Sequence, residues 1–432
     1  MKALTHANVF DFDTYQPDRY VLFDDQIQQV GPMAAFPGAE EETNCTGGLV
    51  IPGLVVGHAH IYSTLSRGWN APFAPQSFRQ LLEQMWWKLD AALDNRATYA
   101  SGLYSALSYA KHGVTTVIDH HASGAEIGGS LEALRRAVVE EGGLRGVFCF
   151  ETSERFPLED CIEENVHFAQ AHRGETDCAG MFGMHALMTL SDRALDAIAE
   201  KSGDLPVHIH VAESEEDEAQ SLCDTGKRII DRLAAFGLLR PHSILSHGVH
   251  LCPEEVAQLA GKPLFLALNP TSNLNNGVGL PDLHAFQKTG LRCILGNDGM
   301  GYGLEHDMQN LVFGMHGRYQ DPLAATTETL RGILRNTYAC AEAQLGCRLG
   351  RVAPGYAADL VFLPYTPPTP LRPDNVWGHF FFGLLDQFQP YHVWCKGQPV
   401  LREGRPVRLE ETAVCALARE AAQRVWKKTM EI

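Results

Sequence analysis

The chain has few basic residues for its length. Its 432 residues include 35 Lys and Arg against 52 Asp and Glu, so the formal net charge is −17 with histidine neutral. Nucleic acids and anionic membranes attract basic patches, so this balance argues against both as main partners. Apolar residues make up 45% and charged residues 20% of the chain, which is typical of a folded globular protein and excludes disordered and collagen-like chains.

Paired cysteines and long apolar segments are also absent from the sequence. The 11 Cys form no CxxC pair, which indicates buried thiols in a reducing compartment and argues against a disulfide framework or a cysteine-type zinc site. No run of about 18 uncharged apolar residues is found, and the first twenty residues contain no apolar signal-peptide core. We therefore expect a cytoplasmic protein.

Short apolar runs alternate with segments of helical spacing from about Leu49 to Leu295, which is the pattern of repeated βα units around a parallel sheet. The eight runs are GLVVGH (53–58), VTTVID (114–119), LRGVFCF (144–150), AGMFGM (179–184), PVHIHV (206–211), SILSH (243–247), LFLAL (264–268) and LRCILG (291–296). Eight strands with crossover helices are the number that closes a (β/α)8 barrel. The predicted fold class is therefore α/β, with a TIM-type barrel over residues 51–350.

The two ends of the chain have a different pattern. Residues 1–50 and 351–408 carry short β-like stretches separated by turn residues. Two such segments at opposite ends most simply form one discontinuous domain, a small β-sandwich, with the barrel inserted between them. Residues 409–432 have apolar residues at helical spacing and are expected to form a closing C-terminal helix.

Two histidines stand at the end of the first run. His58 and His60 are two residues apart, so in a strand both imidazoles face the same side, at the C-terminal mouth of the predicted barrel. Histidines paired in this way can bind a metal, and they can also be hydrogen-bonded packing groups. The pair alone does not decide between these alternatives.

The fifth run ends in HIHVAE, where His208 and His210 share a face and Glu213 follows three residues beyond His210. A carboxylate just past a strand can reach over a metal without binding it, which is the position of a proton shuttle. The alternative is that Glu213 is a surface charge that begins the acidic run of residues 213–218.

The sixth run ends at His247, and the eighth is followed by Asp298 within GNDGMG. Three imidazoles, those of His58, His60 and His210, therefore arrive with one carboxylate at the C-terminal ends of strands 1, 5 and 8. Packing alone does not explain this coincidence. Imidazole nitrogen with one carboxylate suits Zn²⁺, with Fe²⁺ or Mn²⁺ as alternatives.

These motifs resemble those of the amidohydrolase superfamily. The matching segments are IPGLVVGHAH, HIHVAE, LSHG and GNDG in this order, with GYAADLVF leading into the second β segment. The resemblance covers essentially the whole chain. The chain is most similar to the branch of cytosine deaminases, guanine deaminases and chlorohydrolases (ATZ/TRZ-like), and within it to the SsnA-like aminohydrolases, through HIYSTLSRG, MWWKLDAALD, VIDHHASGAEIGGSL, CFETSER and TPPTPLRPDN.

The resemblance implies a role for each of these residues. The implied metal ligands are His58, His60, His210 and Asp298. Glu213 would be the proton shuttle, and His247 would polarise the substrate or hold the attacking water, so the expected catalytic residues are Glu213, His247 and Asp298. Many superfamily members bridge two metals with a carboxylated Lys at strand 4, but the only Lys between residues 113 and 208 is Lys201, in a helical stretch. One divalent metal is therefore expected, with zinc preferred over iron or manganese.

The chain departs from the branch pattern near the expected substrate. Asn297 precedes the aspartate where Thr or Ser is more usual, and the strand 7 motif is NPTSN where the branch often begins with Cys. Leu187 and Met188 replace a usual Pro-Tyr pair after His185. No ligand is lost, so these departures bear on substrate preference and not on the reaction class.

Loops after barrel strands supply specificity. The predicted substrate-binding residues are His185, Glu151, Arg155, His121, Trp69 and Asn273. Since neighbours in a strand point to opposite faces, at most one of His120 and His121 is expected in the pocket. Glu151 and Arg155 could instead pair with each other. Trp86 and Trp87 are more often core or dimer-contact residues than substrate contacts.

The predicted function is hydrolysis of a C–N bond in a nitrogen heterocycle. The main expectation is an aminohydrolase (deaminase) of a purine-, pterin- or pyrimidine-like compound, in which an activated water attacks the ring carbon while Glu213 carries protons. The alternative is a ring-opening cyclic amidohydrolase of the imidazolone or ureide type. A non-catalytic binding barrel would lack ligands, and none is missing here. The expected partners are a small-molecule substrate and a second copy of the chain in a homodimer, with no nucleic acid and no membrane.

Overall fold

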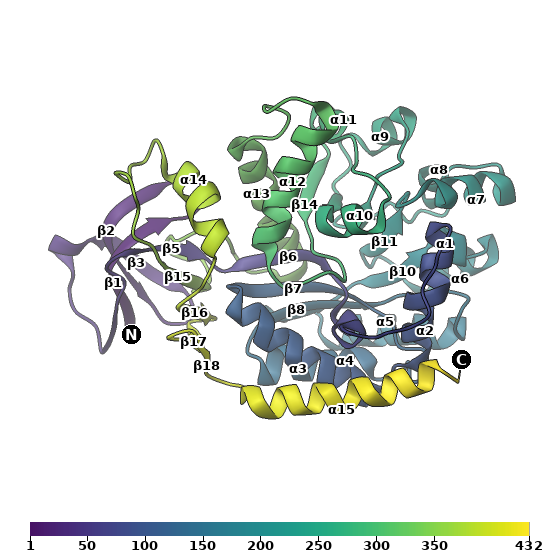
Figure 1. The fold of residues 1–432 in the computed structure, drawn as a ribbon, viewed down its shortest axis with the longest axis horizontal. Helices are drawn as coiled ribbons and strands as arrows, with labels where there is room; N and C mark the ends of the chain where they lie inside the picture. The colour runs from purple at the N-terminus through teal and green to yellow at the C-terminus, as the bar shows by residue number, and fades with distance from the viewer. Residues whose placement is uncertain (432) are drawn as a thin grey trace.

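The computed structural model describes residues 1–431. Its larger part consists of parallel strands surrounded by helices, and a smaller sheet lies at one end (Figure 1). The parallel strands follow the apolar runs of the sequence: β6 (Leu54–Ala59), β7 (Val114–His121), β8 (Arg145–Phe150), β9 (Cys178–Gly180), β10 (Phe182–Ala186), β11 (Val207–Val211), β12 (Ile244–His247), β13 (Phe265–Leu268) and β14 (Arg292–Leu295).

These strands form two sheets. Strands β6 to β9 make a four-stranded sheet and β10 to β14 a five-stranded sheet, each in chain order. The fourth apolar run is divided at Met181, because its first half pairs with β8 and its second half with β11. The α/β class is confirmed, whereas the single hydrogen-bonded ring of eight strands expected from the sequence is divided in this way.

The two sheets meet at both edges. Thr152 pairs with Met184 at one seam, and Ala59 pairs with Asp298 at the other. At the second seam the backbone N–H groups of Asn297 and Asp298 donate to the carbonyl oxygen of His58 at 3.0 and 3.1 Å. The ends of β6 and β14 therefore lie side by side, which brings together the first and last motifs of the sequence.

Helices cover the outside of the parallel strands (Figure 1). They are α1 (Phe78–Leu81), α2 (Trp87–Ala92), α3 (Asn95–Lys111), α4 (Ser130–Arg135), α5 (Leu158–Ala171), α6 (Asp192–Lys201), α7 (Glu215–Thr225), α8 (Ile229–Ala235), α9 (Pro253–Leu259), α10 (Pro270–Asn276), α11 (Leu283–Thr289), α12 (Leu304–Tyr319) and α13 (Thr327–Leu345). The strands pack against them through fully buried side chains such as Ile118, Ile209 and Leu266. This core fixes the strand ends that carry the polar motifs.

The smaller sheet combines both ends of the chain. Its strands are β1 (Lys2–Phe10), β2 (Tyr15–Phe23), β3 (Ile27–Pro32), β4 (Glu41–Asn44), β5 (Gly48–Pro52), β15 (Leu360–Pro364), β16 (His392–Cys395), β17 (Gln398–Arg402) and β18 (Arg405–Pro406). They are hydrogen-bonded as one nine-stranded sheet in which β15 pairs antiparallel with β5. Leu4, Val50 and Leu360 lie in its buried cluster.

Helix α14 (Val376–His379) follows β15, and the long α15 (Glu411–Thr429) passes along the bottom of the view in Figure 1, beneath α3. The predicted helical segment extended to Ile432, which lies outside the described residues. Ion pairs such as Arg96–Glu420 and Lys428–Asp94 join α15 to the helical layer.

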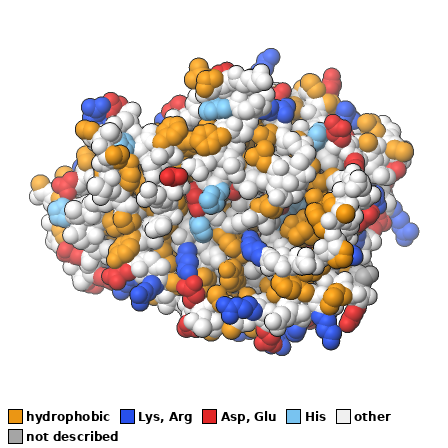
Figure 2. Space-filling model, in the orientation of Figure 1, with side chains coloured by type: hydrophobic (Ala, Val, Ile, Leu, Met, Phe, Trp, Pro, Cys, Tyr) orange, Lys and Arg blue, Asp and Glu red, His pale blue; other side chains and the backbone are white. Residues whose placement is uncertain are grey.

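Two features bear on possible partners. On the face shown in Figure 2, Lys and Arg side chains are interspersed with acidic ones. None of the helices in residues 1–431 has the length and apolar character needed to cross a lipid bilayer.

Candidate active site

The polar motifs lie together at the C-terminal ends of the parallel strands. His58 lies in β6 and His60 directly after it, His210 lies in β11, His247 ends β12, and Asp298 follows β14. Two of these residues have a positive φ, 75° at His247 and 53° at Asp298. Such angles are uncommon for residues with a side chain and are frequent at functional sites. Here they turn the chain sharply at the strand ends.

The four residues predicted as metal ligands converge. Asp298 Oδ1 lies 3.0 Å from His60 Nε2 and 3.7 Å from His58 Nε2. His60 Nε2 and His210 Nε2 are 3.2 Å apart. The three imidazoles come from strands on opposite sides of a seam between the two sheets, so the convergence depends on the whole parallel assembly and not on one motif.

The second ring nitrogen of each histidine is held by a neighbour. The Nδ1 contacts are His58 to His208 Nε2 at 2.8 Å, His60 to the His120 carbonyl at 2.7 Å and His210 to the His185 carbonyl at 2.8 Å. A carbonyl oxygen only accepts, so His60 and His210 each donate a proton from Nδ1, and the Nε2 atom of each ring faces the centre. This is the usual arrangement of metal-binding histidines.

The residues present fit a divalent metal. The Nε2 atoms of His58 and His247 are buried and have no hydrogen-bond partner, and such atoms are rare in folded proteins without a ligand. Burial, together with neighbouring imidazoles, lowers the pKa of His58 and of His210, which keeps both in the neutral form that binds metal. Imidazole nitrogen and carboxylate oxygen are both ligands of catalytic zinc.

Glu213 and His247 lie beside this centre. Glu213 Oε2 is 3.5 Å from His247 Nε2, and His247 Nε2 is 3.9 Å from Asp298 Oδ2. Burial is the main cause that raises the pKa of Glu213. Behind it, Asp217 Oδ2 accepts a hydrogen bond of 2.9 Å from the backbone N–H of Ala212, which fixes the turn before Glu213.

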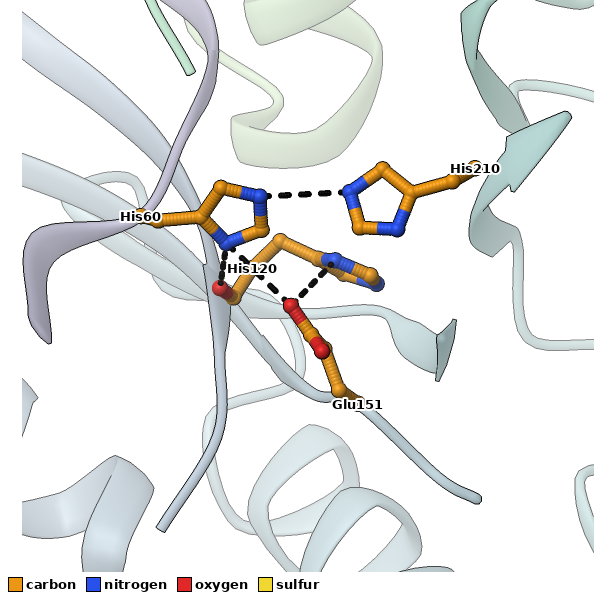
Figure 3. A group of neighbouring side chains, drawn as sticks. All are labelled: His60, His120, Glu151 and His210. Carbon is orange, nitrogen blue, oxygen red and sulfur yellow. Dashed lines mark hydrogen bonds and ion pairs between the residues drawn. The ribbon is translucent and has the colours of Figure 1, made fainter. Parts of the chain in front are cut away.

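Glu151 faces the imidazoles of His60 and His120 (Figure 3). Its Oε1 is 3.2 Å from His60 Nδ1 and 3.3 Å from His120 Nδ1. Burial alone would raise the pKa of Glu151, but the two imidazoles hold it well below its usual range. Glu151 therefore supports His60, although its side chain also reaches the wall of the adjoining cavity.

A cavity of about 690 Å³, counting its open mouth, adjoins the centre. Its apolar wall is made by Tyr62, Phe78, Leu82, Trp86, Trp87, Met188 and Met300. His185 also lines it, and burial lowers the pKa of His185 to about 3, so its ring is neutral. An apolar wall with a few convergent polar groups is typical of a small-molecule site.

Four predicted substrate-binding residues are not part of this wall. His121 is buried on the other side of β7, with Nε2 3.4 Å from Thr98 Oγ1, because β7 continues through it and His120 takes the inward position. Trp69 packs against the apolar cluster behind Tyr62 and does not itself line the cavity. Asn273 Oδ1 lies 2.8 Å from His247 Nδ1 and orients that ring. Arg155 lies behind the wall, where Nη1 donates to Asp90 Oδ2 at 2.8 Å.

Several residues of the site were not predicted. Asp90 and Asp217 line the cavity, and His208 holds His58. Trp86 and Trp87, which the sequence suggested as core or dimer residues, also line it. A signal existed for Asp90, since it is an acid inside the otherwise apolar segment MWWKLDAALD, and for His208, which shares a strand face with His210.

A model of the amidohydrolase family matches residues 49–400. The chain belongs to the amidohydrolase family. Among curated relatives, a 5'-deoxyadenosine deaminase of Methanothermobacter thermautotrophicus is 28% identical over 97% of both chains. A 5-methylthioadenosine/S-adenosylhomocysteine deaminase of Halobacterium salinarum is 27% identical over 94% of this chain and 93% of its own.

Solved structures of similar fold align with nearly the whole of this chain. A zinc-bound adenosine deaminase from Xanthomonas campestris has a TM-score of 0.84 at 21% identity, covering 99% of this chain and 98% of that one. A zinc complex of an atrazine chlorohydrolase from Arthrobacter aurescens has a TM-score of 0.82 at 18% identity, covering 98% and 100%. The fold is thus of the TIM-barrel type, with the seams described above.

The family match confirms the amidohydrolase membership that the sequence motifs predict. Membership of this family makes the protein a hydrolase.

Proposed function

We propose that the protein is a zinc-dependent aminohydrolase that releases ammonia from an amino group on a planar nitrogen heterocycle of the purine, pterin or pyrimidine type. The observation that carries this proposal is the position of Glu213. Its carboxylate lies at the cavity wall, 3.5 Å from His247 and next to the converged group of His58, His60, His210 and Asp298. A proton carrier and a metal-type donor set therefore lie together at the edge of an apolar cavity.

The chain's own residues divide the work of hydrolysis. When bound, the metal would supply a water of lowered pKa, about 7 in catalytic zinc sites. Glu213 takes up one proton from the water and gives it to the ring nitrogen. It then takes up the second proton from the oxygen now bonded to the ring carbon and gives it to the exocyclic nitrogen, which leaves as ammonia. The raised pKa of Glu213 suits this exchange.

His247 is oriented for the attacking water. Asn273 Oδ1 accepts from His247 Nδ1, so in the neutral ring Nε2 faces the centre as an acceptor. This arrangement favours holding the water over donating a hydrogen bond to the substrate, the two roles that the family resemblance left open. The unpartnered Nε2 is consistent with it.

The cavity wall supports an aromatic substrate. Tyr62, Trp86 and Trp87 offer aromatic surface to a planar ring. Deamination rather than ring opening is supported by relatives that are named as deaminases of 5'-deoxyadenosine and of methylthioadenosine. The zinc in the two similar structures supports zinc as the metal.

The test is turnover by protein of known metal content. Metal is measured by mass spectrometry, and a panel of amino-substituted purines, pterins and pyrimidines and of cyclic ureides is followed by ammonia release and ultraviolet absorbance. Ammonia formed in equal amount to the amine consumed supports the proposal. A ring-opened product without ammonia would replace deamination by ring opening, and no turnover of any compound by zinc-loaded protein contradicts the proposal.

A further inference from the structure

The cavity wall carries acids and no fixed cation. Its lining includes five carboxylates, those of Asp90, Glu151, Glu213, Asp217 and Asp298, and no Lys or Arg. Asp90 Oδ1 and Asp217 Oδ1 are buried and without a hydrogen-bond partner. His185 is neutral, so it does not offset these charges.

The nearest guanidinium lies behind the wall, beside two of its carboxylates. Arg155 Nη1 donates to Asp90 Oδ2 at 2.8 Å, and its Nη2 lies 3.7 Å from Glu151 Oε2. Its charge also faces the ring of Trp87, with 5.1 Å between the guanidinium carbon and the ring centroid. Its Nε and Nη2 are buried without a hydrogen-bond partner, and the side chain is not part of the cavity lining.

The start of helix α7 adds further acids next to Asp217. Glu215 and Glu216 precede Asp217 there, whereas Glu218 is paired with Arg228 at 3.2 Å. Glu216 Oε2 accepts a 3.0 Å hydrogen bond from the backbone N–H of Arg79, which joins the start of α7 to α1 beside the cavity. The guanidinium of Arg79 is paired with Glu83 at 2.9 Å.

The net charge of the cavity lining remains negative when a divalent metal is bound. Asp298 and Glu213 lie at the centre and offset the two charges of the metal. Burial raises the pKa of Asp90 to about 6 and that of Asp217 to about 7, so Asp217 is partly protonated near neutral pH. Asp90 and Glu151 already outweigh the single charge of Arg155, and the ionised fraction of Asp217 adds to the excess. Since fields inside a poorly solvated cleft are screened less than on a surface, the excess acts on any ligand that enters.

We propose that the cavity selects by charge: it admits uncharged or cationic heterocycles and rejects those that carry an anionic group, such as a phosphate, sulfonate or carboxylate. The proposal takes the location of the reaction centre from the proposed function, but it concerns entry into the cavity and not the reaction. It would restrict the substrates to free bases and uncharged derivatives, and exclude nucleotides.

Aromatic chelators of purine size test entry without any turnover. The metal-loaded protein is mixed with 8-hydroxyquinoline, with its neutral 5-sulfonamide and with its anionic 5-sulfonate, and the chelator-dependent rate of metal removal is measured. The sulfonamide matches the sulfonate in size. We expect the sulfonate to react at least about tenfold more slowly than the sulfonamide, because like charges are brought together. The ratio of the sulfonamide rate to the sulfonate rate should fall at high salt, because salt screens charge repulsion. A steric barrier would not change with salt.

A variant pair locates the effect in the wall. Met188 lines the cavity and is half-buried. Met188→Lys should raise the rate of metal removal by the sulfonate towards the rate for the sulfonamide. Met188→Gln, which has a neutral side chain of similar length, should leave the sulfonate rate unchanged.

Each other outcome overturns the proposal. Equal rates for the sulfonate and the sulfonamide mean that charge does not control entry, and a ratio unaffected by salt and by Met188→Lys means that the barrier is steric. No chelator-dependent rate for any of the three compounds means that the cavity does not admit neutral rings. Failure of the aminohydrolase assay leaves these measurements intact, so the two proposals fail separately.

Discussion

The ring nitrogens that face away from the centre determine how the histidines are held. His58 Nδ1 is paired with another imidazole, that of His208, which in turn lies 3.7 Å from Cys149 Sγ. His60 and His210 use backbone carbonyls instead. The three rings are therefore held by contacts of different chemistry, and a substitution behind one ring should affect that ring first.

Glu213→Gln separates proton transfer from metal binding. Glutamine keeps the size and hydrogen-bonding shape of the side chain but cannot carry protons. We expect the metal content to stay near that of the unchanged protein while turnover falls by roughly 10²-fold or more, as for a lost general acid or base. Metal analysis and steady-state rates on the same samples measure both. Full activity would contradict the shuttle role, and loss of metal would make Glu213 a ligand.

Glu151→Gln tests the support of His60. The variant keeps an acceptor oxygen but removes the charge that faces His60 Nδ1 at 3.2 Å. Since partners of metal-binding histidines typically contribute 10- to 100-fold in metal affinity, we expect a rise of that order in the metal dissociation constant. Competition with a chromophoric chelator measures it.

Glu163→Gln is the matched control, because Glu163 is an exposed acid on α5. The control should leave the affinity for metal unchanged. If Glu151→Gln also leaves it unchanged and only the Michaelis constant rises, Glu151 is a substrate contact, as the sequence predicts.

At the scale of elements, the seam between β6 and β14 controls the site. Gly296 follows β14, and a Cβ there would lie 2.4 Å from Asn269 Oδ1 and 2.8 Å from His58 Cβ. Only a residue without a side chain lets the two strands approach this closely. The position of His58 therefore depends on a glycine of the opposite strand.

Gly296→Ala should displace His58 without removing a ligand. We expect a loss of stability of about 1–3 kcal/mol, as for other overpacked interiors, together with weaker metal binding. Thermal unfolding and metal titration measure the two effects. Gly301→Ala is the control, since nothing lies within 4 Å of its Cβ position. Equal behaviour of the two variants would mean that the seam tolerates the extra atom.

At the scale of the whole molecule, one metal links segments from both sheets. His58 and His60 belong to the first sheet's edge, and His210 to the second sheet. A ligand that binds the folded state alone stabilises it, by about 2.7 kcal/mol when its free concentration is 100 times the dissociation constant. Protein with bound metal should therefore have a higher free energy of unfolding than protein without it.

We expect about one tightly held divalent metal per chain and a lower Tm after chelation, restored by adding zinc. No Lys lies at the end of β10 to bridge a second metal. Metal analysis of active protein and calorimetry of the chelated form check this. Two equivalents per chain in active protein, or a Tm unaffected by chelation, would contradict it. The homodimer stays a prediction, which light scattering would test.

The strands, and the strand ends that carry the chemistry, follow from the sequence alone. The apolar runs coincide with β6 to β14 because a strand buried on both faces must be apolar, and the residues after each run then stand at one common edge. For this reason the sequence pattern is sufficient to name His58, His60, His210, His247 and Asp298.

The contacts of each side chain, in contrast, depend on the tertiary structure. It directs His120 rather than His121 inward, places Glu151 against His60, pairs Arg155 with Asp90 and sets Asn273 behind His247. It also divides the fourth run at Met181. The local sequence pattern specifies where a strand lies, which of its residues share a face and whether it is buried, because these properties depend on neighbours in the chain. Partners such as Asp90 and Arg155, 65 residues apart, are selected by how loops pack across the strand ends, and no local pattern encodes that packing.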